Sequence, residues 1–417
     1  MKHLVVVPSM KLGKTDIQCL RCGSSHSKKK VGLPKEKIKF FYCPTCIQMG
    51  RVRSDQPFYY LEEPEPIACR EINYFWKGTL TDYQKKASAD LVTHALAKQD
   101  FLIWAVTGAG KTEMIFEMLN QALSKDWRVC LTSPRVDVCL ELFPRIKEVF
   151  PKENMALLHG DGKEPYHYSK LVICTTHQLF RFYRAFDVVV LDEVDAFPFS
   201  GNVELNYAVR HARKEESALV LLTATPDKHL LSQIKKGHLS YVKIPKRYHG
   251  YPLPLPKTIW LSRLPQKISQ GSLPPKFHTL LKKQLRSKHR LLIFCPTVEL
   301  VINLQSVLSK EYKGYSICGV YAEDSERKKK VENMRKEHYD VLISTTILER
   351  GVTFKGIDVF VISASHQVFN TASLVQIAGR VGRNYQFPSG KVYFFHEGKS
   401  RAMKLAIKQI KTMNRAD

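Results

Sequence analysis

The sequence predicts an α/β protein with two tandem parallel-sheet domains and a small cysteine-bearing domain in front of them. Short apolar runs alternate with amphipathic stretches in two series, and a Pro-rich break separates the two series. Apolar runs of this length between helical stretches are typical of buried parallel strands. Two Cys-x-x-Cys pairs near the N-terminus indicate the third, smaller domain.

At 417 residues the chain is too long for one hydrophobic core, so we expect two or three domains. In chain order the sequence predicts a basic four-cysteine domain (1–55), an aromatic and Pro-rich connector (56–79), a first α/β domain (80–245), a Pro-rich linker that runs into the next domain (246–275), a second α/β domain (258–398) and a basic C-terminal helix (399–417).

Eleven apolar runs are expected to form the strands of the two sheets. In the first domain they lie at 101–106, 128–131, 171–174, 188–191 and 218–222. In the second domain they lie at 258–261, 291–295, 317–321, 341–344, 359–363 and 392–395. The intervening helices are the crossover connections that parallel strands require.

The charge balance points to a polyanionic partner. Lys and Arg exceed Asp and Glu by 26 charges, which favours DNA, RNA or an acidic membrane face, although some basic proteins are simply soluble. No apolar stretch approaches the roughly 20 residues of a membrane span. The apolar segment near the N-terminus is too short for a signal peptide, so we expect a cytoplasmic protein.

A glycine-containing loop follows the first apolar run and is the strongest candidate for a phosphate site. Gly108 and Gly110 let the backbone turn its N–H groups toward phosphate oxygens, and Lys111 can reach the β- and γ-phosphates of ATP. The hydroxyl of Thr112 can bind Mg²⁺. Ala105 stands where the stricter motif has Gly, and a chance Gly-rich turn is the alternative. The residues of this loop are Thr107, Gly108, Ala109, Gly110, Lys111 and Thr112.

Asp192 and Glu193 follow the apolar run at 188–191 directly. Acidic residues at the carboxyl end of a parallel strand lie in the crevice where α/β sheets bind ligands. We expect Asp192 to hold Mg²⁺ and Glu193 to polarise the attacking water. The alternative is a solvated turn or a helix cap.

Arg380 and Arg383 lie three residues apart, and a helix that begins near Thr371 is expected to place both on one face. An arginine supplied from a second domain can stabilise charge that develops on the γ-phosphate. Gln376 and two nearby glycines, which permit close approach, favour this role over a solvated basic face.

Cys19, Cys22, Cys43 and Cys46 have the spacing of a four-thiolate zinc site, which we expect to be structural. A redox dithiol pair is the alternative. Lysines between the two pairs neutralise phosphates, and the aromatic run at 40–42 either stacks on bases or forms the small core of this domain. These lysines are Lys28, Lys29, Lys30, Lys35, Lys37 and Lys39. The six other cysteines are expected in hydrophobic cores.

The order of these motifs, from about residue 80 to 397, resembles that of superfamily 2 helicases and translocases. The resemblance implies two RecA-like domains, with Gln84 hydrogen-bonded to the adenine base and Trp76 stacked near it. It also implies that the segments 132–135 and 174–178 contact the nucleic-acid strand, and that 344–346 and 349–352 touch both nucleic acid and nucleotide. The segment 223–225 is implied to couple hydrolysis to domain movement.

Four features make the resemblance more specific than the superfamily. They are the basic four-cysteine segment, the aromatic connector, the pattern Trp-x-Gly-x-Leu-Thr at 76–81 and Asp-Glu-Val-Asp at 192–195. Together they resemble the ComFA family of competence ATPases. The resemblance implies an ATPase stimulated by single-stranded DNA that drives DNA uptake. It also implies other late-competence proteins as partners, assembly into homo-oligomers, and work at the inner face of the membrane.

Three alternatives remain open from the sequence. A replication-restart helicase or an RNA helicase shares the ATPase core, although the zinc-binding cysteines of the replication-restart family lie elsewhere in the chain. A protein of another class, a zinc-dependent nucleic-acid-binding adaptor with a regulatory ATP site, is the third. The presence of Lys111, Asp192, Glu193 and Arg383 disfavours the adaptor.

Overall fold

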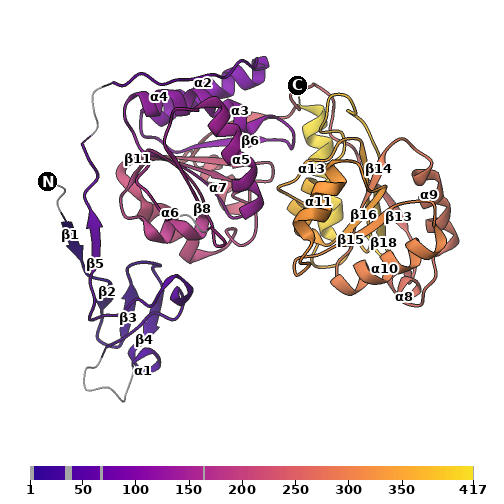
Figure 1. Cartoon of the computed structure of the whole chain (residues 1–417), viewed down its shortest axis with the longest axis horizontal. Coiled ribbons are helices and arrows are strands. Elements are labelled where there is room, and N and C mark those ends of the chain that lie inside the picture. Colours follow the sequence, from indigo (N-terminus) through magenta and orange to yellow (C-terminus); the bar gives the residue numbers. More distant parts are fainter. Residues whose placement is uncertain (1–3, 33–39, 66–68, 163–164, 417) are drawn as a thin grey trace. The chain divides into compact units, whose positions relative to one another are not determined.

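The computed structural model describes residues 4–32, 40–65, 69–162 and 165–416 (Figure 1). Contacts divide the chain into two units, which are considered separately here. The first unit holds Met1–Ile103 and Thr112–Val242, and the second holds Trp104–Lys111 and Lys243–Asp417. Three of the lysines expected to meet phosphates, Lys35, Lys37 and Lys39, lie outside the described residues.

The N-terminal part of the first unit, here called the cysteine module, consists of short antiparallel strands. Strand β1 (Leu4–Val7) pairs with β5 (Phe58–Leu61), and β2 (Met10–Leu12), β3 (Asp16–Cys19) and β4 (Ser25–Ser27) form a second small sheet. Helix α1 (Lys28–Val31) and the 3₁₀ turn η1 (Ile47–Met49) complete it. Its core contains all four predicted metal ligands together with Met10, Ile17 and Val31.

A seven-stranded sheet follows, with strand order β12-β6-β11-β10-β7-β9-β8. The strands are β6 (Phe101–Ala105), β7 (Val129–Ser133), β8 (Met155–Leu158), β9 (Leu171–Thr175), β10 (Phe186–Asp192), β11 (Arg213–Thr223) and β12 (Ser240–Ile244). The pairings of β10 with β11 and β7, and of β9 with β7 and β8, are parallel.

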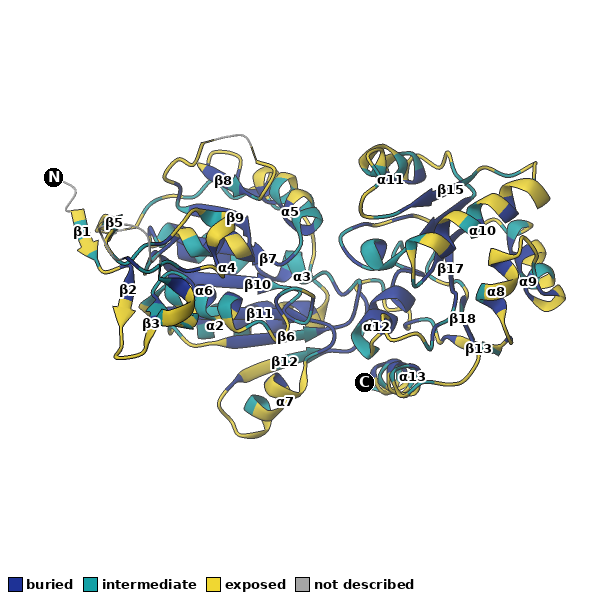
Figure 2. Ribbon diagram, turned by 90° about the horizontal axis from the view of Figure 1, so that it is seen from below, coloured by how far each residue is buried: buried dark blue, intermediate teal, exposed yellow. Residues whose placement is uncertain are grey.

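Helices connect these strands and cover the sheet with their apolar faces (Figure 2). Local capping explains several starts: Thr81 and Gln84 form a capping box at α2, Asn202 caps α6, and Asp227 caps α7. The elements are α2 (Asp82–Leu96), α3 (Lys111–Met114), α4 (Phe116–Ser124), α5 (Val136–Val149), η2 (Thr176–Arg181), α6 (Val203–Ala212) and α7 (Lys228–Lys235).

The second unit contains a six-stranded sheet in the order β13-β18-β17-β14-β16-β15, and all five of its pairings are parallel. The strands are β13 (Lys257–Trp260), β14 (Arg290–Phe294), β15 (Ile317–Val320), β16 (Val341–Ser344), β17 (Ile357–Val361) and β18 (Val392–His396). The connecting elements are α8 (Leu264–Ser269), α9 (Pro275–Leu285), α10 (Val298–Glu311), α11 (Arg327–Arg335), η3 (Thr346–Leu348), α12 (Thr371–Ala378) and α13 (Arg401–Arg415).

The predicted fold class is confirmed: two parallel-sheet α/β units follow a small four-cysteine domain. Each of the eleven predicted strands overlaps an observed strand. Strands β8 and β12 were not predicted, and the Pro-rich stretch also contains the short helix α8. Of the six cysteines expected in cores, five are buried, but Cys69 is exposed, so the prediction is wrong for that residue.

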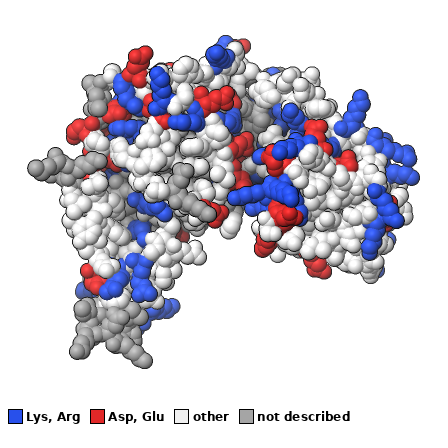
Figure 3. Space-filling view, in the orientation of Figure 1, with Lys and Arg blue, Asp and Glu red and all other residues white. Residues whose placement is uncertain are grey.

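Basic side chains are distributed over the visible face of both units, with acidic side chains between them (Figure 3). The net positive charge is therefore not confined to the cysteine module. None of the described helices is long and apolar enough to cross a membrane.

Candidate active site and metal centre

The predicted phosphate loop leaves the end of β6 and leads into α3. Gly108 and Gly110 adopt φ angles of +79° and +73°, a region that residues with a side chain rarely occupy. Lys111 is the first residue of α3, and Thr107 and Ala109 of the loop itself are buried. Because both positive φ angles occur at glycine, the backbone can adopt the bend that a phosphate-binding loop requires.

Asp192 is the last residue of β10, and it lines a small hollow in the first unit together with Thr112. A carboxylate and a hydroxyl that share one hollow supply the oxygen ligands that Mg²⁺ prefers. The next residue, Glu193, has a φ of +56°, and its backbone N–H donates to Oδ1 of Asp192 at 2.8 Å. A positive φ is costly for a residue with a side chain, so this sharp turn marks a constrained position at the strand end.

Asp195, for which no role was predicted, joins the acidic strand end to the Thr-Ala-Thr segment at the end of β11. The hydroxyl of Thr223 donates to one oxygen of its carboxylate at 2.6 Å, and the hydroxyl of Thr225 donates to the other. Its place as the fourth residue of the Asp-Glu-Val-Asp motif is the feature from which this role could have been predicted. The predicted coupling segment is therefore bonded to the same turn that carries Glu193.

Gln84 and Trp76 lie near the start of α2. The side-chain carbonyl of Gln84 accepts a hydrogen bond from the backbone N–H of Thr81 at 2.8 Å, so this buried side chain contributes to the helix cap. The Trp76 ring packs edge-on against Phe116, and a Cβ at Gly78 would lie 2.5 Å from the ring. Contact of Gln84 and Trp76 with adenine stays a prediction.

In the second unit, Arg380 and Arg383 lie in a turn beyond α12. The helix ends at Ala378, so the prediction that one helix face carries both arginines is wrong. Gly382 explains the break, because its φ is +72° and a Cβ there would lie 2.4 Å from the carbonyl oxygen of Pro388. Gly382 thus allows the backbone of Pro388 to pack closely against the turn, whereas close approach to a nucleotide stays a prediction.

The two arginines differ in their surroundings. Arg380 is 1% exposed, and its Nε donates to the backbone oxygen of Glu349 at 3.0 Å. Arg383 is half-buried, and its Nε donates to the oxygen of Gly379 at 3.2 Å. The carboxylate of Glu349 also accepts a hydrogen bond from Ser373 of α12. Arg380 is thus tied to the predicted nucleic-acid segment at 349–352, whereas Arg383 is the more accessible of the pair.

Arg247, which the sequence analysis did not single out, holds this arginine turn. It lies between β12 and β13 and is 2% exposed. Its Nη1 donates to the oxygens of Val381 and Gly382 at 2.8 and 2.5 Å, and its Nη2 donates to that of Gly379 at 3.1 Å. Burial, together with the nearby charge of Arg383, lowers the pKa of Arg247 to about 9.

The four cysteines of the module converge as the sequence predicts. All four ligand sulfurs lie within 4.8 Å of one another, with Cys19–Cys46 at 3.8 Å and Cys22–Cys43 at 3.6 Å. A tetrahedral site with Zn–S bonds of ~2.3 Å has sulfur–sulfur edges of about 3.8 Å. The cluster therefore fits a tetrahedral thiolate-bound metal ion.

Hydrogen bonds between the thiols favour ionisation of part of the cluster. The bond from Cys19 lowers the pKa of Cys22 to about 7 and that of Cys43 well below its usual range, whereas the pKa of Cys19 itself is raised. The Arg21 guanidinium donates to Sγ of Cys46 at 3.1 Å and to the oxygen of Met49 at 2.9 Å. A fixed cation beside the thiolates partly balances their charge.

Aromatic side chains join the cysteine module to α6 and to the segment that follows η2 in the same unit. The Tyr207 hydroxyl donates to the oxygen of Leu20 at 3.1 Å, and the rings of Tyr60 and Tyr183 lie 4.7 Å apart. A Cβ at Gly23 would lie 2.5 Å from the Tyr207 ring. Gly23, whose φ is +77°, permits this packing because it has no side chain.

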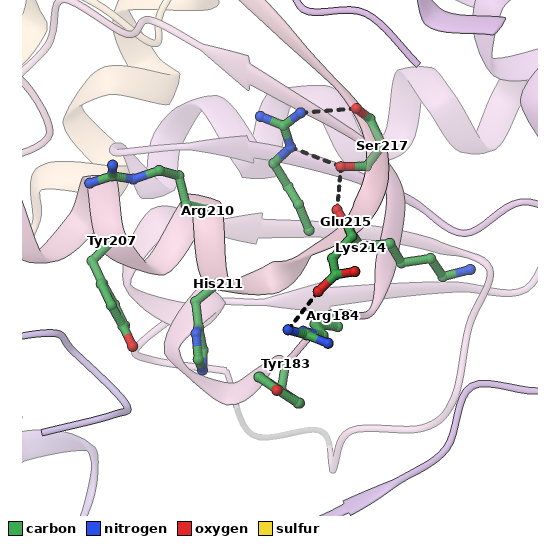
Figure 4. A pocket seen from close by; sticks show the side chains of 9 residues that line it. Tyr183, Arg184, Tyr207, Arg210, His211, Lys214, Glu215 and Ser217 are labelled. Atoms are coloured by element: carbon green, nitrogen blue, oxygen red, sulfur yellow. Dashed lines mark hydrogen bonds and ion pairs between the residues drawn. The ribbon is translucent and has the colours of Figure 1, made fainter. Parts of the chain in front are cut away.

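A hollow of about 580 Å³ lies beside these rings (Figure 4). Three of its four Lys and Arg residues are paired with carboxylates: Arg184 with Glu215 at 2.7 Å, Arg213 with Asp100 at 2.6 Å, and Lys214 with Asp187 at 2.8 Å. The fourth, Arg210, donates from Nε to the backbone oxygen of Asn206 at 3.4 Å. Because most of this charge is already compensated, the hollow is a weak candidate for an anion site.

Family models assign both α/β units to one class of enzyme. Residues 77–228 match the res subunit of type III restriction enzymes, and residues 275–385 match the helicase conserved C-terminal domain. Together with the parallel sheets and the phosphate loop, these matches define a superfamily 2 helicase-type ATPase.

The N-terminal segment and the whole-chain comparisons identify the family. Residues 1–60 match the competence protein ComFA N-terminal domain. The chain is 41% identical to ComFA of Streptococcus pneumoniae, covering 98% of this chain and 93% of that protein. It is 38% identical to ComFA of Bacillus subtilis, covering 99% and 89%. The chain therefore belongs to the ComFA family of competence proteins.

More distant similarities cover only part of this chain. The replication restart protein PriA of Rickettsia prowazekii is 26% identical over 54% of this chain and 38% of its own length. S. cerevisiae Dbp5 bound to RNA and ADP BeF3 superposes with a TM-score of 0.59 at 17% identity, covering 81% of this chain and 92% of that one. This second likeness shows the fold alone.

Proposed function

We propose that the chain is an ATP-driven motor on single-stranded DNA that acts in DNA uptake during natural competence. The observation that carries this proposal is near-full-length identity of about two in five residues with ComFA proteins. The helicase-type units supply the class of reaction, which is ATP hydrolysis coupled to movement on nucleic acid. The names of the ComFA relatives, which are competence proteins, supply the cellular process.

In this proposal the first unit and the phosphate loop bind and activate ATP. The N–H groups around Gly108 and Gly110 and the ammonium of Lys111 hold the phosphates. Thr112 and Asp192 hold Mg²⁺, which neutralises phosphate charge when bound. Glu193 orients and polarises the attacking water. Gln84 contacts the adenine base, so ATP is distinguished from other nucleotides.

The arginine turn of the second unit completes the proposed chemistry. Arg383, which is half-buried, stabilises negative charge that develops on the γ-phosphate. Arg380, which is buried and tied to Glu349, supports the same turn and links it to the strand-binding segment. Hydrolysis would thereby depend on the position of the second unit, as a motor requires.

Cys19, Cys22, Cys43 and Cys46 would hold a structural Zn²⁺. All four cysteines are buried, and the group of possible metal ligands found among the described residues consists of these four; His26 Nε2 lies 3.6 Å from Sγ of Cys43, outside that group. A closed four-thiolate site has no open position for chemistry. The metal would stabilise a module that is otherwise too small for a large core.

Steady-state ATP hydrolysis tests the proposal, measured with no nucleic acid, single-stranded DNA, duplex DNA and RNA. We expect single-stranded DNA to stimulate turnover severalfold and more than the other additions. Stimulation mainly by RNA would instead support an RNA helicase. No turnover under any of these conditions, with the protein folded and metal bound, would refute the enzymatic proposal.

A further inference from the structure

Helix α13 carries a row of basic side chains along its outer face. All five are exposed, they recur every three or four residues, and the helix contains no acidic residue. None of the five has a carboxylate partner among the residues that the structure describes. We call these residues the α13 row: Arg401, Lys404, Lys408, Lys411 and Arg415.

Helix α11 of the same unit shows how a solvated basic helix is normally balanced. Lys330 pairs with Asp324 at 2.7 Å, and Lys329 pairs with Glu326 at 3.6 Å. Arg335 lies 3.5 Å from a carboxylate oxygen of Glu332. The α13 row lacks such compensation, so its neighbouring like charges repel one another along the helix.

The geometry of the row fits a linear polyanion. Residues 401 to 415 span about 21 Å, with one cation for about every 5 Å of helix. The helix contains no aromatic residue, so it offers no ring on which a base could stack. Contacts from such a row go to phosphates and are independent of sequence.

A membrane surface fits the same helix less well. Interfacial helices bury their apolar face among lipid chains. In α13 that face is already buried within the second unit through Met403, Ala406, Ile410 and Met413, where it packs against α12. Apart from Leu405, the exposed residues of the helix are charged or polar.

The helix is also fixed to its unit at the C-terminal end. The Asn414 side chain accepts from the backbone N–H of Leu253 at 2.9 Å and donates to the oxygen of the same residue at 2.8 Å. Its partner helix α12 leads directly into the turn of Arg380 and Arg383. An anion bound to α13 would thus be held by the body that carries the arginine turn.

We propose that the α13 row binds the phosphate backbone of single-stranded DNA and gives the second unit a grip on the strand beyond the predicted motif segments. This inference rests on the proposed function, because it takes the strand to be the substrate of the motor. The row would contribute affinity without sequence preference. Its contribution would weaken as salt rises.

The test removes three charges from the centre of the row, in the variant Lys404→Gln, Lys408→Gln and Lys411→Gln. Binding of fluorescent oligothymidylate is measured by anisotropy over a range of salt concentrations. Each phosphate contact adds about 0.7 to the slope of log affinity against log salt, so we expect the slope to fall by about 2. The matched control is Lys276→Gln, Lys282→Gln and Lys283→Gln, three exposed lysines of α9 in the same unit.

Loss of slope in the α13 variant but not in the α9 variant supports the inference. If both variants keep the wild-type slope while single-stranded DNA still stimulates the wild-type ATPase, the inference is overturned and the proposed function stays intact. Absence of strand binding and of stimulation in the wild type overturns both. If the α13 variant loses binding to phosphatidylglycerol vesicles while its DNA slope is unchanged, the row is a membrane contact instead.

Discussion

The buried guanidinium of Arg247 holds the turn that carries Arg380 and Arg383. Three backbone oxygens of that turn accept its hydrogen bonds, and burying a charge is costly unless it is bonded in this way. Removal of the guanidinium would leave those oxygens buried without their donors. The turn would then relax, and Arg383 would no longer be held in one position.

We therefore expect Arg247→Ala to lower kcat for ATP hydrolysis by about tenfold or more, which corresponds to about 1.4 kcal/mol of transition-state stabilisation. The dissociation constant of a fluorescent ATP analogue should change little. Arg247→Lys should restore only part of the rate, because an ammonium cannot reproduce the planar fork. The exposed Arg286→Ala is the control. A wild-type kcat in Arg247→Ala would remove the assigned role.

Single residues mark the limit of prediction from this sequence. The phosphate loop and the acidic strand end carry recognisable spacing, and the structure shows glycine at both positive-φ positions of the loop. Arg247 is one arginine in a Pro-rich stretch and belongs to no repeated pattern. Its hydrogen-bond partners are backbone oxygens more than a hundred positions away. Every residue has a backbone oxygen, so such acceptors cannot be identified from residue types.

At the level of elements, apolar runs predicted the strands because central parallel strands are buried on both faces. Within the two large sheets, the two strands that were not predicted lie at the ends of the first sheet: β12 begins with two exposed residues, and β8 has only four residues. Helix α12, which was expected to carry Arg380 and Arg383, was predicted too long for a different reason. Its apolar period continues to Val381, but the glycines of the turn end the helix earlier.

The cysteine module is the element that a metal ion would stabilise most directly. Structural zinc contributes about 10–16 kcal/mol to folding in small zinc-binding peptides, which exceeds the stability of a module of this size. We expect Cys43→Ser to lower bound zinc well below one ion per chain, as measured by mass spectrometry of the purified protein. Limited proteolysis should then cleave within the first sixty residues.

The control for this prediction is Cys69→Ser, because Cys69 is the exposed cysteine outside the cluster. It should retain full zinc and the wild-type proteolytic pattern. Full zinc content in Cys43→Ser would contradict the four-thiolate assignment. Since Tyr207 and Tyr60 join the module to the first α/β domain, loss of metal should also lower the melting temperature of the whole unit.

At the scale of the whole molecule, the central claim is that ATP hydrolysis moves the protein along DNA. Each unit contributes part of the proposed machinery: Asp192 and Glu193 end a strand of the first, whereas Arg383 follows α12 of the second. Asp195 bonds the acidic turn to Thr223 and Thr225, so a change at the nucleotide has a direct route to the segment expected to couple it to movement.

The most direct measurement is displacement of streptavidin from single-stranded DNA biotinylated at either end. We predict that ATP accelerates displacement from one end with the wild-type protein, and that Lys111→Ala, which lacks the phosphate-binding ammonium, abolishes the acceleration. Hydrolysis stimulated by single-stranded DNA without displacement from either end would contradict the motor and leave an ATP-regulated DNA-binding protein in its place.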